Sequence, residues 1–251
     1  MPTLTRPTDP AAAEVTCRFG ETPITNAELR AWEARRAAVN LKRMGVDVPA
    51  GDLEDRRAVL LEAKLQRGRD WADRRYARQL TVSDRVQRAV AIASRGRRRL
   101  CQVEIFVPDV SGAAFTDWYL DRAANQDDAA MLGASPDHHL FRMVDEGRQE
   151  VMETTGGSPI ASRFFFTFDE DDHLTLAADP TFPVQITGTA RLVDGTVVGG
   201  IRHQFRDEAG GARAFLTVEF PRLVAPQAVS AHRWHLAAEF VAWLELSRRP
   251  D

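Results

Sequence analysis

The sequence has few of the residues that would tie it to secretion or to a membrane. Its two cysteines, Cys17 and Cys101, lie far apart and form no CxxC pair, which excludes a disulfide scaffold and favours reduced thiols in a cytosol. No apolar run approaches the roughly 20 residues that span a bilayer. The first residues, Met1–Ala13, contain no apolar segment typical of a secretory signal. These absences predict a cytoplasmic protein that does not contact membranes.

Lysine is also scarce, since Lys42 and Lys64 are the two lysines among 33 basic residues. We attribute this excess of arginine to genome composition rather than to phosphate recognition, and we predict no nucleic-acid partner. The charges are unevenly distributed along the chain. Residues 1–105 hold 21 basic and 14 acidic residues, whereas residues 106–251 hold 12 basic and 22 acidic residues. The two parts of the chain therefore differ in character.

The front part is predicted to be helical. After an extended or mobile lead-in over residues 1–23, the pattern indicates a helix from Ala27 and a break over Gly45–Gly51. It then indicates a helix from residue 52 or 53 to about Leu80, and a third helix from Thr81 to about Ser94. We therefore predict an N-terminal helical segment over residues 1–98 and a second domain over residues 99–251.

The back part reads as a strand, one or two short helices, several strands and a long helix. Strands are expected near residues 100–107, 139–144, 148–154, 160–168, 184–193, 196–206 and 212–220, with turns at Asp194-Gly195 and Gly210-Gly211. The short helices fall within residues 113–132, and the long helix runs from Pro226 to about Arg248. This order resembles the START/Bet v1-like helix-grip fold, an α+β class in which an antiparallel sheet wraps around a C-terminal helix. The resemblance implies a cavity for an apolar or aromatic small molecule.

The C-terminal helix carries the most informative polar cluster. His232, His235 and Glu239 fall within about 60° of one another on a helical wheel, on the apolar side. Burying a carboxylate costs several kcal/mol unless it is paired or bound to a metal. Histidine and glutamate at i and i+4 can donate to one cation. The alternatives are that Glu239 pairs with Arg163 or Arg202, or that His235 is an ordinary core histidine.

Three other places could contribute to a site. Pro136-Asp137-His138-His139-Leu140 precedes a strand, and Glu153 lies at a strand end ahead of Gly156-Gly157. Taken alone, these residues are typical of a polar turn and a solvated strand end. Strand alternation places His203 on the apolar face with Ile201 and Phe205, as a core or cavity-lining histidine.

The ordered set of these motifs resembles the family of 2,4-diacetylphloroglucinol hydrolase, a zinc-dependent C–C bond hydrolase on a Bet v1-like domain. The resemblance covers roughly residues 100–248 and implies zinc (Zn²⁺) held by two histidines and two glutamates. The matching positions are His139, Glu153, His235 and Glu239, with His203 as the catalytic acid or base in the cavity. Alternation sends His138 and His139 to opposite faces of the strand, so either neighbour could be the ligand.

This chain departs from the family at two positions that face substrate. Met131 and Arg142 stand where the family has a tyrosine and an asparagine, so the usual phenol contacts are missing. We predict substrate contacts from these two positions and from Phe240 and Trp243. The expected activity is hydrolysis of a C–C bond beside a carbonyl in a small aromatic or polyketide-like substrate. The alternatives are a metal-free START-type cyclase or aromatase, and a carrier of an apolar molecule. The N-terminal helices could also form a homodimer interface.

Overall fold

A computed structural model describes residues 15–145 and 147–248. Within these residues, nine strands form a single antiparallel sheet in the order β2-β1-β3-β9-β8-β7-β6-β5-β4. The strands are β1 (Thr16–Phe19), β2 (Thr22–Ile24), β3 (Arg98–Pro108), β4 (His138–Asp145), β5 (Arg148–Glu153), β6 (Ser162–Phe168), β7 (Val184–Arg191), β8 (Val197–Glu208) and β9 (Gly211–Pro221). The helices are α1 (Asn26–Arg43), α2 (Leu53–Ser94), α3 (Gly112–Ala124), α4 (Asp128–Gly133), the 3₁₀ turn η1 (Thr155–Gly157) and α5 (Pro226–Leu246).

The expected order of elements from residue 98 onward is confirmed. Each strand predicted there is present within a few residues of its expected bounds, as are the two short helices and the long C-terminal helix. Burial alternates along β3, where Cys101, Val103, Ile105 and Val107 face the core. The predicted turns at Gly195 and Gly210 are also present, and both glycines have a positive φ.

The lead-in is partly a strand pair. The prediction for residues 1–23 falls in part on residues 1–14, which lie outside the described residues. Beyond them, β1 pairs with β2 and also with β3, so that Cys17 lies opposite Ile105. The hairpin therefore extends the sheet, because the exposed edge of β3 offers unpaired backbone groups to an added strand.

The predicted break between Leu80 and Thr81 is wrong. The chain stays helical from Leu53 to Ser94, because the Thr81 hydroxyl bonds to the Ala77 carbonyl inside the helix instead of capping a new one. The irregularity lies at Gly68 instead, where φ is 68° and ψ is 177°, a conformation essentially restricted to glycine. At its start, α1 is capped by Thr25, which forms a reciprocal capping box with Glu28.

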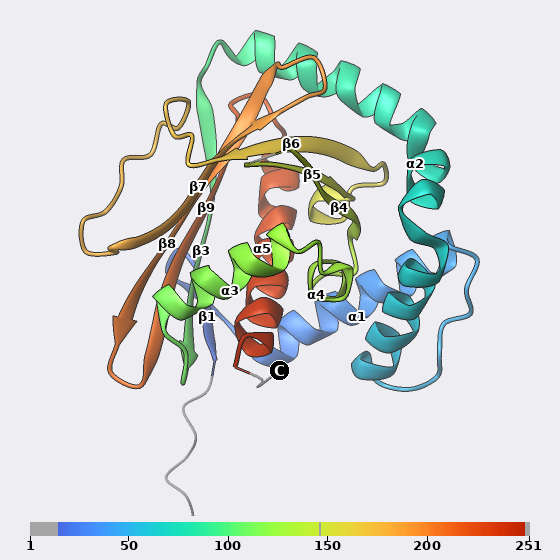
Figure 1. Ribbon diagram of the computed structural model, residues 1–251, viewed down its shortest axis with the longest axis horizontal. Coiled ribbons are helices and arrows are strands. Elements are labelled where there is room, and N and C mark those ends of the chain that lie inside the picture. Colours follow the sequence, from blue (N-terminus) through green and yellow to red (C-terminus); the bar gives the residue numbers. More distant parts are fainter. Residues whose placement is uncertain (1–14, 146, 249–251) are drawn as a thin grey trace, which may run out of the picture.

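The sheet wraps around α5 (Figure 1). This helix packs on β3, on η1 and on α1. Helix α4 lies against β4, and α3 lies against β4, β7, β8 and β9. In Figure 1, α2 bends around one side of the molecule and over the end of the sheet. Fully buried side chains such as Phe205, Leu216 and Leu236 join the sheet to α5, and burying each stabilises the fold by about 1.5–3 kcal/mol. The chain thus has the predicted α+β helix-grip fold.

No helix among the described residues is long and apolar enough to cross a membrane.

Candidate metal centre and cavity

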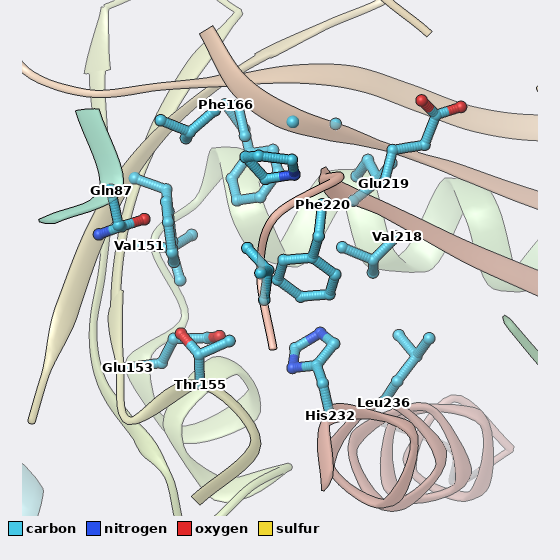
Figure 2. A pocket seen from close by; sticks show the side chains of 18 of the residues that line it. Gln87, Val151, Glu153, Thr155, Phe166, Val218, Glu219, Phe220, His232 and Leu236 are labelled. Atoms are coloured by element: carbon cyan, nitrogen blue, oxygen red, sulfur yellow. The ribbon is translucent and has the colours of Figure 1, made fainter. Parts of the chain in front are cut away.

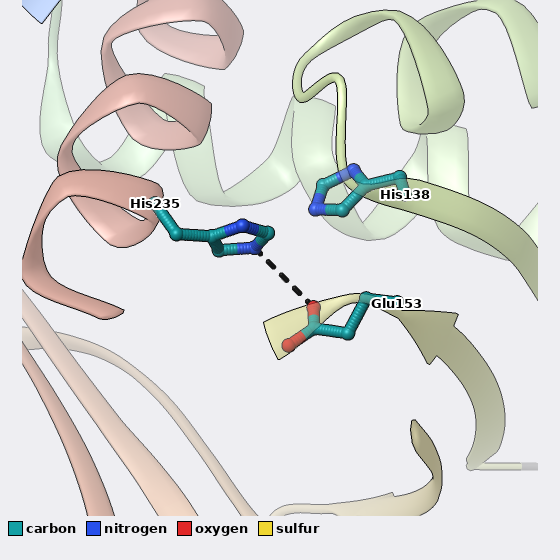
Figure 3. A group of neighbouring side chains, drawn as sticks. All are labelled: His138, Glu153 and His235. Carbon is teal, nitrogen blue, oxygen red and sulfur yellow. Dashed lines mark ion pairs between the residues drawn. The ribbon is translucent and has the colours of Figure 1, made fainter. Parts of the chain in front are cut away.

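Four polar side chains meet where β4 and β5 approach α5. His138 begins β4 and lies directly opposite Glu153, the last residue of β5. His235 and Glu239 stand one turn apart on α5. Ligand atoms of His138, Glu153 and His235 all lie within 4.8 Å of one another, which is close enough for one metal ion (Figure 3). The sheet register and the helical period therefore bring together residues from distant parts of the chain.

His138 is fixed at both ring nitrogens. Its Nδ1 lies 2.8 Å from the carbonyl oxygen of Met131, which can only accept, so Nδ1 carries the proton. Its Nε2 lies 2.9 Å from Oε2 of Glu239, and because an ionised carboxylate only accepts, either a proton or a metal ion must lie between these two atoms. A carbonyl that orients the outer nitrogen of a histidine is typical of metal ligands.

His235 faces two carboxylates with one nitrogen. Its Nε2 lies 3.3 Å from Oε2 of Glu153 and 3.3 Å from Oε2 of Glu239, yet it has no hydrogen-bond partner of good geometry. Its Nδ1 lies 3.5 Å from the Ser135 hydroxyl and 3.9 Å from Oδ2 of Asp137. The inner nitrogen is therefore a buried polar atom without a proper partner, which is the position of a metal donor.

Asp137 is held behind His235 by three side chains. The guanidinium of Arg36 donates to both carboxylate oxygens, the Asn40 amide donates to Oδ1 over 2.9 Å, and the Thr154 hydroxyl also donates to Oδ1. Burial alone would raise the pKa of Asp137, but the nearby His235 and Arg36 lower it well below its usual range. Asp137 therefore stays ionised, and its negative charge lies 3.9 Å from the outer nitrogen of His235.

The charges in the centre are strongly coupled. Burial opposes charge on His235, but the carboxylates of Glu153 and Glu239 outweigh it and raise the pKa of His235 well above its usual range. Conversely, burial would raise the pKa of both glutamates, but the charge on His235 lowers them. The protein therefore holds two buried carboxylates that need a positive charge, from a proton or from a metal ion.

The structure places His139 outside this group. Its ring stacks on Tyr76 of α2 with the ring centres 4.5 Å apart, and its Nε2 lies 3.4 Å from the Thr154 hydroxyl. Strand alternation turns His139 toward α2 once His138 faces α5. Of the two neighbours that the sequence left open, His138 is therefore the one brought to Glu153, His235 and Glu239.

A cavity of about 310 Å³ lies between the sheet and α5, next to the metal centre. Glu153 and His232 of α5 line its wall (Figure 2). Glu239 and His203 of β8 line it as well. Burial lowers the pKa of His203 to about 4 and, together with the charge on His235, lowers the pKa of His232 to about 4. Both cavity imidazoles are therefore neutral near pH 7. Most of the remaining wall is apolar or aromatic.

Two of the four predicted substrate positions line this cavity. Phe240 and Trp243 do so, whereas Met131 and Arg142 do not. The side chain of Met131 is buried in the core, and its carbonyl holds His138. Arg142 instead forms ion pairs with Glu150 and Asp73. Met131 and Arg142 were assigned by taking His139 as the first metal ligand. Because His138 takes that place in the structure, the assignment is shifted by one residue, and these two positions miss the cavity.

The two arginine alternatives for Glu239 do not hold. Arg163 pairs with Asp73 and Glu150, and Arg202 pairs with Asp171 and donates to the carbonyl of Leu176. Neither arginine has a recorded contact with Glu239, whose partners are His138 and His235. The carboxylate of Glu239 thus contacts the two histidines and neither arginine.

Sequence reasoning missed the supporting residues. Arg36 lies 101 residues before Asp137, and no local pattern links them. His232 had a signal, since the helical wheel placed it beside His235. In the structure its ring stacks on His235 with the centres 5.1 Å apart.

Comparisons with known proteins give a fold likeness alone. No family model and no curated protein matches the sequence. Among solved structures, Ara h 8.0201 is 12% identical with a TM-score of 0.43, over 60% of this chain and 98% of that one. Protein Ms6760 from Mycobacterium smegmatis is 14% identical with a TM-score of 0.34, over 58% and 87%. The lipid transfer and protein localization domain of human StarD13 (DLC2) is 14% identical with a TM-score of 0.32, over 61% and 78%. These likenesses are too distant to carry a function to this chain.

Proposed function

We propose that this protein is a zinc-dependent hydrolase that cleaves a C–C bond beside a carbonyl group in a small apolar or aromatic substrate. The observation that carries the proposal is the convergence of His138, Glu153, His235 and Glu239 beside an apolar cavity. The same four residue types hold zinc in the hydrolase family that the sequence resembles, with His138 taking the place first assigned to His139.

The donor set fits a zinc ion in three respects. Two imidazoles and two carboxylates are common zinc ligands, and zinc held by them could expand to five-coordinate to accept the oxygen of a carbonyl or a water. Nε2 of His235 is buried without a proper partner. The outer nitrogens of both histidines face acceptors, Met131 for His138 and Asp137 with Ser135 for His235. Two carboxylates would also neutralise the ion, which suits a buried site.

The chemistry requires a polarised carbonyl and a proton carrier. When bound, zinc would polarise the carbonyl or lower the pKa of a water molecule toward neutrality. Hydrolysis then adds the hydroxyl of water to the acyl carbon and a proton to the carbon that leaves. His203 supports this exchange, because it is neutral near pH 7 and its buried Nδ1 has no partner in the protein. Phe240 and Trp243 give the cavity an aromatic wall against which an apolar substrate can pack.

The first test is the metal content of the purified protein. Protein expressed with zinc and prepared without chelators is expected to hold about one zinc per chain, as measured by elemental analysis. His235→Ala should remove the metal. Loss of a hydrogen bond that supports a ligand weakens metal binding by about 10–100-fold. Glu239→Gln should weaken zinc binding by more than this. His173→Ala is the matched control, because His173 is exposed on a loop.

Melting temperatures on the same variants separate a metal site from a structural ion pair. If the cluster were a core ion pair alone, breaking it would destabilise the fold by about 3–5 kcal/mol with no metal in the parent protein. Metal-free parent protein would refute the zinc hydrolase. The cavity would then favour a metal-free cyclase or a carrier of an apolar molecule.

A further inference from the structure

Two imidazoles face the cavity with atoms that the protein does not satisfy. His203 reaches it from β8 and His232 from α5, and their side chains are almost fully buried, with 4% and 5% of each residue exposed. The Nδ1 atoms of both rings have no hydrogen-bond partner in the protein. Because buried polar groups are nearly always paired and both rings line the cavity, each imidazole can offer a hydrogen bond to an occupant.

Both rings are held in place by packing. His232 stacks on His235 and meets the edge of Phe220, with ring centres 5.1 Å apart in each case. Figure 2 shows the His232 ring rising from α5 into the cavity toward Phe220. From β8, on the sheet side of the cavity, the His203 ring meets Phe240 of α5 with the centres 4.7 Å apart. The two contacts are therefore preoriented on separate walls.

The cavity offers no cation to an anionic ligand. Among the described residues that line it there is no lysine or arginine, whereas Glu153, Glu219 and Glu239 are present. Glu219 is already occupied, since it accepts from the backbone of Thr175 and Leu176. A zinc ion held by two carboxylates would carry no excess positive charge. A carboxylate or phosphate group would thus enter a neutral or negative site.

The size of the cavity sets a further limit. At about 310 Å³ the cavity lies at the lower end of the roughly 300–1,000 Å³ that is typical of small-molecule pockets. We therefore expect a small occupant, and a largely apolar one because most of the wall is apolar.

We propose that His232 is a specificity-determining contact that works together with His203. The two imidazoles select an uncharged, compact molecule with a polar group at each end, such as a carbonyl and a hydroxyl. This inference rests on the proposed function in one respect, namely that the cavity is where the substrate binds. His232 itself is assigned no part in holding the metal.

Three probes of similar size test this selection. These are 4-hydroxyacetophenone, with two polar groups, acetophenone, with one, and 4-hydroxybenzoate, which is anionic at neutral pH. Binding is followed through the change in tryptophan fluorescence, because Trp243, one of the five tryptophans, lines the cavity. The full-length protein should bind 4-hydroxyacetophenone about tenfold more tightly than the other two, which is the effect expected of one added hydrogen bond.

The variants then assign the contact to His232. His232→Phe keeps an aromatic ring that can stack on His235, and it should weaken binding of 4-hydroxyacetophenone about tenfold without changing binding of acetophenone. His232→Gln should restore part of the affinity, because an amide can also hydrogen bond. His173→Phe is the surface control and should change nothing. A melting temperature on each variant confirms that it is folded.

Three results would overturn the inference. The first is equal binding of 4-hydroxybenzoate and 4-hydroxyacetophenone, and the second is unchanged binding by His232→Phe. The third is loss of zinc from His232→Phe, because His232 would then be a ligand. Zinc analysis of the same samples separates the two proposals. Metal-free parent protein that still discriminates the probes would refute the hydrolase and leave this inference standing, and zinc-loaded protein without discrimination would do the reverse.

Discussion

Lys64 is a buried ammonium group behind the turn that leads into His138. Its Nζ lies 2.9 Å from the carbonyl oxygens of both Leu132 and Ser135, which flank that turn. Burial lowers the pKa of Lys64 to about 7, although the charge on Asp137 opposes this. In the unfolded chain the pKa of lysine is about 10.4. The folded protein therefore releases this proton at a lower pH than the unfolded chain does.

This difference in pKa makes stability depend on pH. Below pH 7 both states bind the proton. Above pH 7 the folded state binds fewer protons than the unfolded state, so the free energy of unfolding rises with pH, by at most about 1.4 kcal/mol per pH unit. We expect the parent protein to show this rise between pH 7 and 8.5 relative to Lys64→Met. Urea unfolding of both proteins in the presence of a chelator measures it.

The variant has its own control in the same experiment. Lys42→Met removes an exposed lysine of α1 and should follow the parent curve at every pH. Parallel curves for the parent and Lys64→Met would contradict the assigned pKa. A lower overall stability of Lys64→Met would not by itself decide the matter, because the variant also loses two hydrogen bonds to carbonyl groups.

At the scale of elements, η1 presses directly on α5. A Cβ atom at Gly156 would lie 2.7 Å from the backbone nitrogen of His232 and 2.9 Å from its Cα, and Gly156 has a φ of +57°. Because η1 follows Glu153 and α5 carries His235, this contact sets the separation of two proposed ligands. A glycine is therefore needed here for close approach as well as for conformation.

Gly156→Ala should separate these two elements. We expect a loss of about 1–3 kcal/mol of stability from the strained backbone, together with weaker zinc binding in a titration against a chromophoric chelator. Gly195→Ala is the matched control, since Gly195 also has a positive φ but has nothing within 4 Å of the position of a Cβ. The control should lose stability and keep its zinc affinity. Equal zinc affinity in both variants would refute the role of this contact.

At the scale of the whole molecule, the chain is expected to open first at the junction of α2 and β3. Arg95 and Gly96 are exposed there and both have a positive φ. The first part of the chain is nevertheless held to the rest by the pairing of β1 with β3 and by the bond from Arg36 to Asp137. The two parts of the chain on either side of the proposed boundary at residues 98 and 99 therefore remain in contact.

Limited digestion with trypsin tests this division. The earliest cut within residues 24–248 should fall at Arg95–Arg99, ahead of any cut in residues 100–248. The two pieces should elute together in size-exclusion chromatography and separate only in denaturant, because the strand pairing does not depend on the peptide bond that is cut. Early cleavage concentrated in residues 196–220 would contradict both the division and the stability of the hairpin of β8 and β9.

How far the sequence predicts the molecule depends on the range of the interactions involved. The strands and the C-terminal helix follow from periodicity and turn residues, which act over a few residues, as in the alternation along β3. The same local rule placed His235 and Glu239 on one face of α5, one turn apart. The continuity of α2 past Thr81 could not be predicted in this way, because a hydroxyl can cap a helix or bond within it.

The sequence by itself determined the order of elements from residue 98 onward and the placing of the two proposed ligands on α5, since both depend on backbone geometry that repeats within one segment. Tertiary structure alone decided that His138 faces α5 while His139 faces Tyr76, because alternation fixes only that the two neighbours point apart. It also brought Arg36 to Asp137 across 101 residues. Such contacts depend on how the sheet closes around the helix, and this is set by burial of the whole apolar surface rather than by any local pattern.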